Sequence, residues 1–158
     1  MKKNGILKMI TSLALPLAAG ALGSVFTAKA IPSWYVSIQK PFFNPPSWVF
    51  GPVWTVLYVL MGISFFMIWR MSGGTEGRKN AIRVFLWQLS LNAIWTPIFF
   101  GFKSPEAALV VIVALWVMIV KTIRIFGTLN RSAAYLLIPY LLWVSFAALL
   151  NGAIAYLN

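Results

Sequence analysis

The sequence predicts an all-α membrane protein whose transmembrane helices form one five-helix bundle. Two observations carry this prediction: 61% of the 158 residues are hydrophobic and only 9% are charged, a composition that a water-exposed globular surface does not have. A bilayer core about 30 Å thick needs about 20 apolar residues for each crossing. The chain has room for about five crossings with short loops, so residues 1–158 are expected to form a single domain.

Proline, glycine and charged residues separate the apolar runs. The segment from Lys29 to Pro46 is rich in proline and is expected to be an irregular loop, and the glycine-rich break at 70–80 closes the second run. Pro105 suits the first turn of a helix, where a missing N–H is no loss. The predicted helices are residues 6–28, 47–69, 82–102, 106–126 and 132–157.

The first apolar run allows two interpretations. Lysines precede it and Ala28-Lys29-Ala30 ends it, as in a cleaved signal peptide. The run from Met9 to Ala28 is longer than the apolar part of a signal peptide, and it carries small residues at helical spacing, which suits close helix contact in lipid. We therefore expect a retained first span, with a homodimer contact on the face formed by Ala19, Gly20, Gly23 and Ser24.

The net charge of +11 is distributed unevenly between the two ends of the expected bundle. Ten of the thirteen cations fall on the side of the N-terminus, and Lys29, Lys40 and Lys103 fall on the other. By the positive-inside rule the N-terminus is expected in the cytoplasm and the C-terminus outside, in a bacterial cell membrane. Because these cations flank membrane spans, membrane lipid is the expected partner and nucleic acid is not.

The residue inventory excludes most enzyme chemistry. The sequence has no His and no Cys, and its acidic residues are Glu76 and Glu106, both expected in loops or at a helix end. Neither a metal site nor a general acid–base pair is predicted. Ion-coupled transport is also disfavoured, because no ionisable pair lies inside a span.

Aromatic and polar residues recur at i, i+3 and i+4 spacing in three of the expected spans, so each set occupies one helix face. One interpretation is plain packing, with amides bonding between helices. The other is a shared cavity that stacks a planar ligand on indole rings. We expect three spans to be interrupted by proline, at Pro52, Pro97 and Pro139. One interpretation of each is a simple kink, and the other interpretation of Pro139 is that it shapes part of the cavity wall. The stripes are Trp54, Tyr58, Met61, Phe65 and Trp69; Gln88, Asn92, Trp95 and Phe99; and Pro139, Trp143, Ala147, Leu150 and Asn151.

Three blocks of sequence resemble the TspO/MBR family of tryptophan-rich sensory and translocator (peripheral benzodiazepine receptor) proteins. They are KPFFNPPSWVFGPVWT at 40–55 with LY at 57–58 and MG at 61–62, QLSLNAIWTPIFFG at 88–101, and PYLLWVSFA at 139–147. The likeness runs in register from Trp34 to Asn151. It implies a five-helix bundle, commonly dimeric, that binds porphyrins such as protoporphyrin IX and, in some members, sterols and synthetic drugs.

The resemblance also implies a ligand site among the first, second, third and fifth helices, under the loop Lys29 to Pro46. Phe43 stands where the family usually has Trp, which keeps a stacking face and loses an indole donor. The sterol motif of animal members is not matched, because Gly152 and Tyr156 replace its Tyr and Arg. The ligand-binding residues expected at matching positions are Tyr35, Phe43, Pro45, Trp54, Asn92, Trp95, Trp143, Ala147 and Leu150.

Two functions follow as hypotheses. The first is a receptor, transporter or regulator in tetrapyrrole traffic or stress response that holds a porphyrin by stacking, with Asn92 and Tyr35 as orienting donors and no cofactor of its own. Lys29 and Lys40 either pair with the porphyrin propionates or snorkel to the headgroups. The alternative is an enzyme that degrades porphyrin in the light through Trp54 and Trp143, which match the pair implicated in some bacterial relatives.

Overall fold

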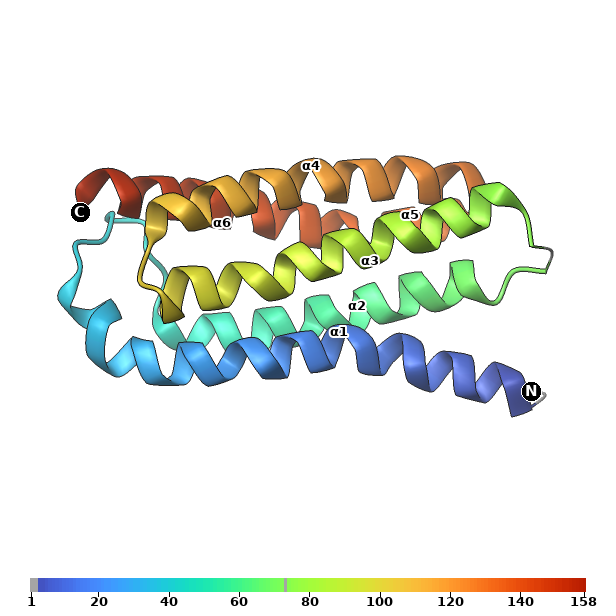
Figure 1. Cartoon of the computed structure of the whole chain (residues 1–158), viewed down its shortest axis with the longest axis horizontal. Helices are drawn as coiled ribbons and strands as arrows, with labels where there is room; N and C mark the ends of the chain where they lie inside the picture. The colour runs from blue at the N-terminus through green and yellow to red at the C-terminus, as the bar shows by residue number, and fades with distance from the viewer. Residues whose placement is uncertain (1–2, 73) are drawn as a thin grey trace.

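The computed structural model describes residues 3–72 and 74–158, which form a bundle of long helices running side by side (Figure 1). Five helical segments are long and apolar enough to cross a membrane, and they confirm the predicted all-α fold with five spans. The chain is therefore a multi-pass integral membrane protein. The elements are α1 (Lys3–Ala30), η1 (Ile31–Tyr35), η2 (Ser47–Val49), α2 (Phe50–Trp69), α3 (Glu76–Thr96), η3 (Pro97–Gly101), α4 (Pro105–Leu129), α5 (Arg131–Tyr135) and α6 (Ile138–Leu157).

Several helix boundaries differ from those predicted. The first span continues past Ala30 into the π-helical turn η1, which accommodates Pro32 in its first turn, so the loop begins later than Lys29. The third helix begins at Glu76 rather than at residue 82, because the Thr75 side chain accepts a hydrogen bond from the Arg78 backbone N–H and caps it. Gly73, in the break before it, lies outside the described residues.

The prolines act mainly at helix starts. Pro52 lies in the first turn of α2 and does not interrupt it, since a first-turn N–H has no intrahelical partner. Pro97 opens the π-helical turn η3 at the end of α3. Pro139 opens α6 after a break at residues 136–137, so the predicted fifth helix is the short α5 followed by α6.

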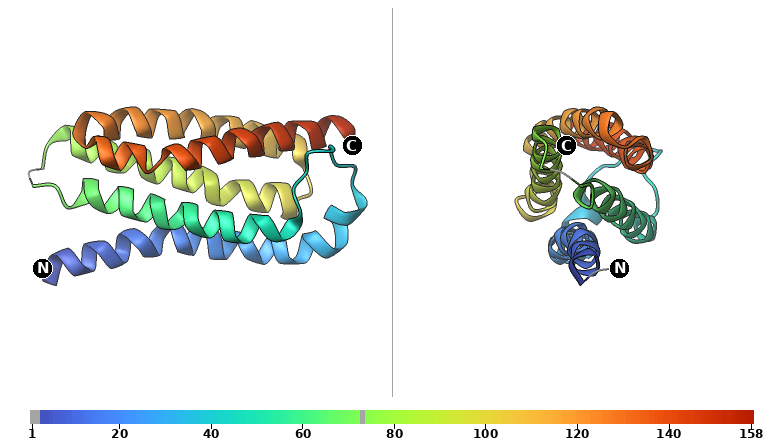
Figure 2. Two further views of the ribbon diagram at one scale, coloured as in Figure 1. Left: turned by 180° about the vertical axis from the view of Figure 1, so that it is seen from behind. Right: turned by 90° about the vertical axis from the view of Figure 1, so that its right-hand side faces the viewer.

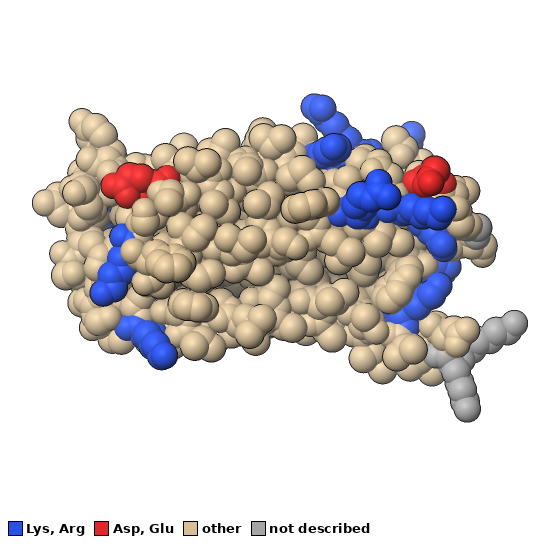
Figure 3. All heavy atoms as spheres, viewed as in Figure 1, with Lys and Arg blue, Asp and Glu red and all other residues tan. Residues whose placement is uncertain are grey.

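Charged side chains gather at the two ends of the bundle. Lys and Arg are concentrated at the end that holds the N-terminus and the α2–α3 turn, while the middle of the visible face carries no charged side chain (Figure 3). The C-terminus lies at the opposite end from the N-terminus, as an odd number of crossings requires (Figure 1). The distribution agrees with a charge-poor zone at the level of the bilayer core.

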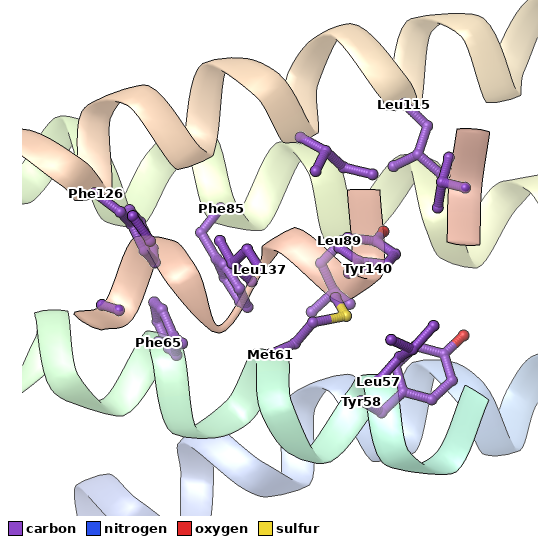
Figure 4. Packing of buried hydrophobic residues seen from close by; sticks show 14 of the residues in the cluster. Leu57, Tyr58, Met61, Phe65, Phe85, Leu89, Leu115, Phe126, Leu137 and Tyr140 are labelled. Carbon is purple, nitrogen blue, oxygen red and sulfur yellow. The ribbon is translucent and has the colours of Figure 1, made fainter. Parts of the chain in front are cut away.

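The half of the bundle near the N-terminus is solidly packed. Phe65 of α2 stacks on Phe85 of α3 with ring centroids 4.4 Å apart, and Phe85 stacks on Phe126 of α4 at 6.0 Å. Met61 and Leu137 lie in the same cluster, between helices α2, α3 and α6 (Figure 4). The residues of the α2 stripe that lie in this half of the bundle, including Met61 and Phe65, therefore pack in the hydrophobic core.

Candidate ligand-binding cavity

A cavity of about 390 Å³ occupies the other half of the bundle, below the loop at 36–46. Its walls come from α1, α2, α3 and α6, with η1 and η3 closing its end, and its volume lies within the usual range of small-molecule sites. The end view of the bundle shows how these helices surround a common axis (Figure 2). The lining residues are Leu17, Gly20, Ala21, Gly23, Ser24, Thr27, Ile31, Tyr35, Phe50, Gly51, Trp54, Thr55, Tyr58, Trp95, Thr96, Phe99, Phe100, Trp143, Ala147, Leu150, Asn151 and Ile154.

Three indoles from three helices line this one cavity. Trp54 of α2 stacks on Tyr58 with ring centroids 5.4 Å apart and an interplanar angle of 27°. Trp95 of α3 stacks on Phe99 at 5.2 Å and 26°. Because each ring rests on another aromatic ring, its orientation is fixed before any ligand binds.

Trp143 of α6 is the third indole, and it packs edge-on against Phe50 at 6.1 Å and 69°. Its Nε1–H is buried and has no hydrogen-bond acceptor among the residues that the structure describes. A buried donor without a partner is costly. The atom is covered by protein, so this N–H does not face the accessible space of the cavity, and Trp143 contributes the rest of its ring to the wall.

Trp95 differs from Trp143 in this respect. Its Nε1–H donates to Asn151 Oδ1 at 3.0 Å, and Asn151 Nδ2 donates to the carbonyl oxygen of Pro105 at 2.7 Å. Asn151 thus anchors the Trp95 ring and ties α6 to the start of α4. The Trp95 ring is available for stacking but its donor is already used.

Asn92 is placed differently from the prediction. Its side chain lies beside the cavity, outside the lining, and joins two tyrosines: its Oδ1 accepts from the Tyr58 hydroxyl at 2.8 Å and its Nδ2 donates to the Tyr140 hydroxyl at 3.0 Å. The Tyr140 hydroxyl donates onward to Gln88 Oε1 at 3.0 Å. Trp54 packs against both tyrosines. Asn92 therefore holds the two tyrosines behind the aromatic wall, at a position outside the cavity lining.

The predicted ligand-binding residues in and beside the loop differ in their position relative to the cavity. Phe43 and Pro45 lie outside the cavity lining, and Phe43 packs edge-on against Phe146 at 6.3 Å. Tyr35 does line the cavity, but its hydroxyl donates to Asn44 Oδ1 at 2.7 Å. Because that proton is committed to the loop, Tyr35 holds the loop in place rather than orienting a ligand.

The two lysines expected near the ligand lie outside the lining as well. Lys29 is exposed at the end of α1. Lys40 Nζ donates to the carbonyl oxygens of Tyr35 at 2.6 Å and Ile38 at 2.9 Å, so it fixes the chain after η1. In this arrangement neither ammonium group reaches into the cavity.

The small residues of α1 pack within the bundle. Gly20 lies directly against the ring of Tyr58, and a Cβ at Gly23 would approach Thr96 Oγ1 of α3 at 3.2 Å. Gly20 and Gly23 of the face expected to form a dimer contact thus pack within the bundle, whereas Ser24 of that face is exposed. The family resemblance implied that the first helix borders the site, but no residue of α1 was predicted to contact a ligand, because the lining residues of α1 are small or aliphatic and form no aromatic stripe.

The expected residues Tyr35, Trp54, Trp95, Trp143, Ala147 and Leu150 do line the cavity, together with Asn151 and Phe99 from the stripes. Pro139, Gln88 and Asn92 from the same stripes lie outside its lining. Fold and site together define a multi-pass membrane protein with an internal, mainly apolar cavity walled by tryptophan. A concave, mainly apolar cavity of this kind is the usual form of a small-molecule site.

Comparison with known proteins identifies the family. The sequence profile of the TspO/MBR family matches residues 12–157. The tryptophan-rich protein TspO of Archaeoglobus fulgidus is 44% identical over 153 residues, covering 97% of this chain and 98% of that protein. Its namesake from Chlorobaculum tepidum is 44% identical over 157 residues, covering 97% of each chain. The translocator protein of Bos taurus is 39% identical over 140 residues, covering 87% of this chain and 82% of that protein.

The chain therefore belongs to the TspO/MBR family, as the sequence blocks indicated. Relatives carry names such as tryptophan-rich sensory protein and translocator protein, which support a membrane receptor-like role.

Proposed function

We propose that this chain binds a porphyrin, such as protoporphyrin IX, in the tryptophan-walled cavity and acts in tetrapyrrole traffic or stress regulation. The observation that carries the proposal is the convergence of Trp54, Trp95 and Trp143 on one cavity. Flat aromatic faces favour a planar macrocycle.

The chemistry at the cavity is binding chemistry. Its polar side chains are hydroxyls, indoles and an amide, and none is an acid or base that changes charge near neutral pH. The proposal does not assign Asn92 or Tyr35 as an orienting donor, because Asn92 lies outside the cavity lining and the Tyr35 hydroxyl donates to Asn44.

The test is quenching of intrinsic tryptophan fluorescence by protoporphyrin IX in purified, liposome-reconstituted protein. Saturable quenching is expected, and Trp143→Ala should weaken binding by about tenfold because one stacking face is lost. Trp87→Ala is the matched control, since Trp87 is 61% exposed on the outer face of α3. Unchanged binding in a Trp54→Ala, Trp143→Ala double variant would refute the stacking role.

A second candidate function is light-dependent breakdown of the bound porphyrin. The observation in its favour is that Trp54 and Trp143 line the same cavity, so both indoles can exchange an electron with a photoexcited macrocycle. The measurement is the product spectrum of the porphyrin complex under illumination and in darkness. Products that form equally well in darkness would exclude this mechanism.

A further inference from the structure

The cavity wall is not equally buried on all sides. Within the described part of the chain, the lining residues with exposed side chains or backbone lie on two helices, α1 and α2. Those lining residues that belong to α6 and α3 are buried or half-buried. The exposed lining residues are Leu17, Ala21, Ser24, Gly51 and Thr55.

These five residues continue the stripe along which α1 and α2 touch. Closer to the N-terminal end of the bundle, Gly62 of α2 meets the backbone of Leu13, and Gly20 meets the ring of Tyr58. Thr55 and Gly51 follow on the same face of α2 at helical spacing. A Cβ at Gly51, however, would meet no atom within 4 Å among the described residues. The seam between α1 and α2 is thus closed up to Tyr58 and open beyond it.

Where the seam is open, the last turns of α1 pack on another partner. A Cβ at Gly23 would contact Thr96 of α3, and Gly101 of η3 lies against the ring of Phe26. These close approaches hold the last turns of α1 against α3 and η3, while Gly51 and Thr55 of α2 stay exposed.

The rim of the gap suits an apolar molecule that arrives from lipid. Ser24 Oγ donates to the Ala21 carbonyl at 2.7 Å, and Thr55 Oγ1 donates to the Gly51 carbonyl at 2.9 Å. Both hydroxyl protons are satisfied within their own helices, so they need no water. The five rim residues carry no charge, and four of them are small.

On the water side, hydrogen bonds hold the loop at 36–46 in place. The Gln39 backbone N–H donates to Asn158 Oδ1 at 2.9 Å, and Asn158 Nδ2 donates to the Gln39 carbonyl oxygen at 3.0 Å. These two bonds tie the loop to the end of α6. The Tyr35 hydroxyl holds Asn44 of the same loop. A ligand passing under the loop would have to break these contacts.

From this geometry we infer that the gap bounded by Leu17, Ala21, Ser24, Gly51 and Thr55 is a lateral portal through which a membrane-dissolved planar ligand reaches the cavity. The inference rests on the proposed function, because it concerns the path of the ligand that the cavity holds. It assigns to the rim residues a role in the rate of binding, while the indoles determine the affinity.

The experiment measures protoporphyrin IX association and dissociation by stopped-flow tryptophan quenching in liposomes. A Ser24→Leu, Thr55→Leu variant narrows the portal and is expected to slow both the association and the dissociation rate about tenfold, so that each rate changes more than Kd does. The matched control is Ala18→Leu, Val56→Leu, which adds bulk to exposed positions of the same two helices outside the cavity lining. Normal equilibrium binding with unchanged rates would overturn the portal alone, whereas absence of binding to the unmodified protein would overturn the proposed function and the portal with it.

A second variant separates access from cavity volume. Because the chain has no cysteine, Thr55→Cys can be modified with a bulky methanethiosulfonate after protoporphyrin IX has bound. Release into empty acceptor liposomes should slow, and reduction should restore it. In parallel, Gln39→Cys and Asn158→Cys bridged by a bis-maleimide fasten the loop. If fastening the loop slows release and modifying Thr55→Cys does not, the ligand passes under the loop and the portal is refuted.

Discussion

Removing the Tyr140 hydroxyl is expected to weaken the bundle measurably while leaving its shape intact. The hydroxyl is fully buried, accepts from Asn92 Nδ2 at 3.0 Å and donates to Gln88 Oε1 at 3.0 Å. Through Asn92 it is also linked to Tyr58, so this network joins α2, α3 and α6. Tyr140→Phe deletes two of its hydrogen bonds and keeps the ring.

The size of the effect follows from the partners left behind. Interhelical hydrogen bonds in membrane proteins contribute about 0.6 kcal/mol on average and about 1.7 kcal/mol at most. Gln88 is 1% exposed and Asn92 is 3% exposed, so water cannot replace the lost partner. Gln88 Nε2 is already without a partner in the described structure, so the whole Gln88 amide would be left unbonded. Two lost bonds with stranded groups predict a destabilisation of about 1–3 kcal/mol.

The assay is equilibrium unfolding by SDS in mixed micelles, compared with Tyr135→Phe, which removes a hydroxyl that is on a 65% exposed side chain. A double-mutant cycle with Gln88→Leu should show non-additivity of at least about 0.5 kcal/mol, because the two residues share one hydrogen bond. If Tyr140→Phe is no less stable than the control, the network does not stabilise the bundle and the reasoning fails.

Three further predictions concern helix contact, the cavity and orientation. Gly62→Leu should destabilise the protein, because even the Cβ of the new side chain would lie 2.9 Å from the α1 backbone. Gly74→Ala should not, because the space around Gly74 is open. Thermal unfolding in detergent compares the two variants. Ala147→Leu should fill part of the cavity and weaken protoporphyrin IX quenching by about tenfold, and unaltered affinity would place the ligand elsewhere. Ser37 lies in the loop expected outside the cell, and Ser72 lies in the turn expected in the cytoplasm. In right-side-out vesicles Ser37→Cys should therefore react with an impermeant maleimide and Ser72→Cys should not. The reverse pattern would show that the N-terminus lies outside.

Homodimerisation stays a prediction of the family resemblance. Gly20 contacts Tyr58 and Gly23 contacts Thr96 within the bundle, while Ser24 of the same predicted face is exposed. Cross-linking in native-like membranes measures the oligomer directly, and a Gly20→Leu change reports on bundle stability instead.

The sequence by itself determined the fold class and most of the aromatic wall. Apolar runs long enough to cross a bilayer are a one-dimensional property, so composition and spacing were sufficient to predict five spans. The indoles of Trp54, Trp95 and Trp143 were also predictable, since helical spacing assigns them to helix faces and the family blocks assign the faces to a site.

Only the tertiary structure decided what each polar group does. Asn92 and Tyr35 are suitable ligand donors by residue type, yet Asn92 donates to Tyr140 and Tyr35 donates to Asn44, which are 48 and 9 residues away along the chain. Likewise, the spacing of Gly20 and Gly23 in α1 did not indicate that they contact Tyr58 and Thr96. A hydrogen bond or a glycine contact depends on the position of its partner, which the local pattern does not contain.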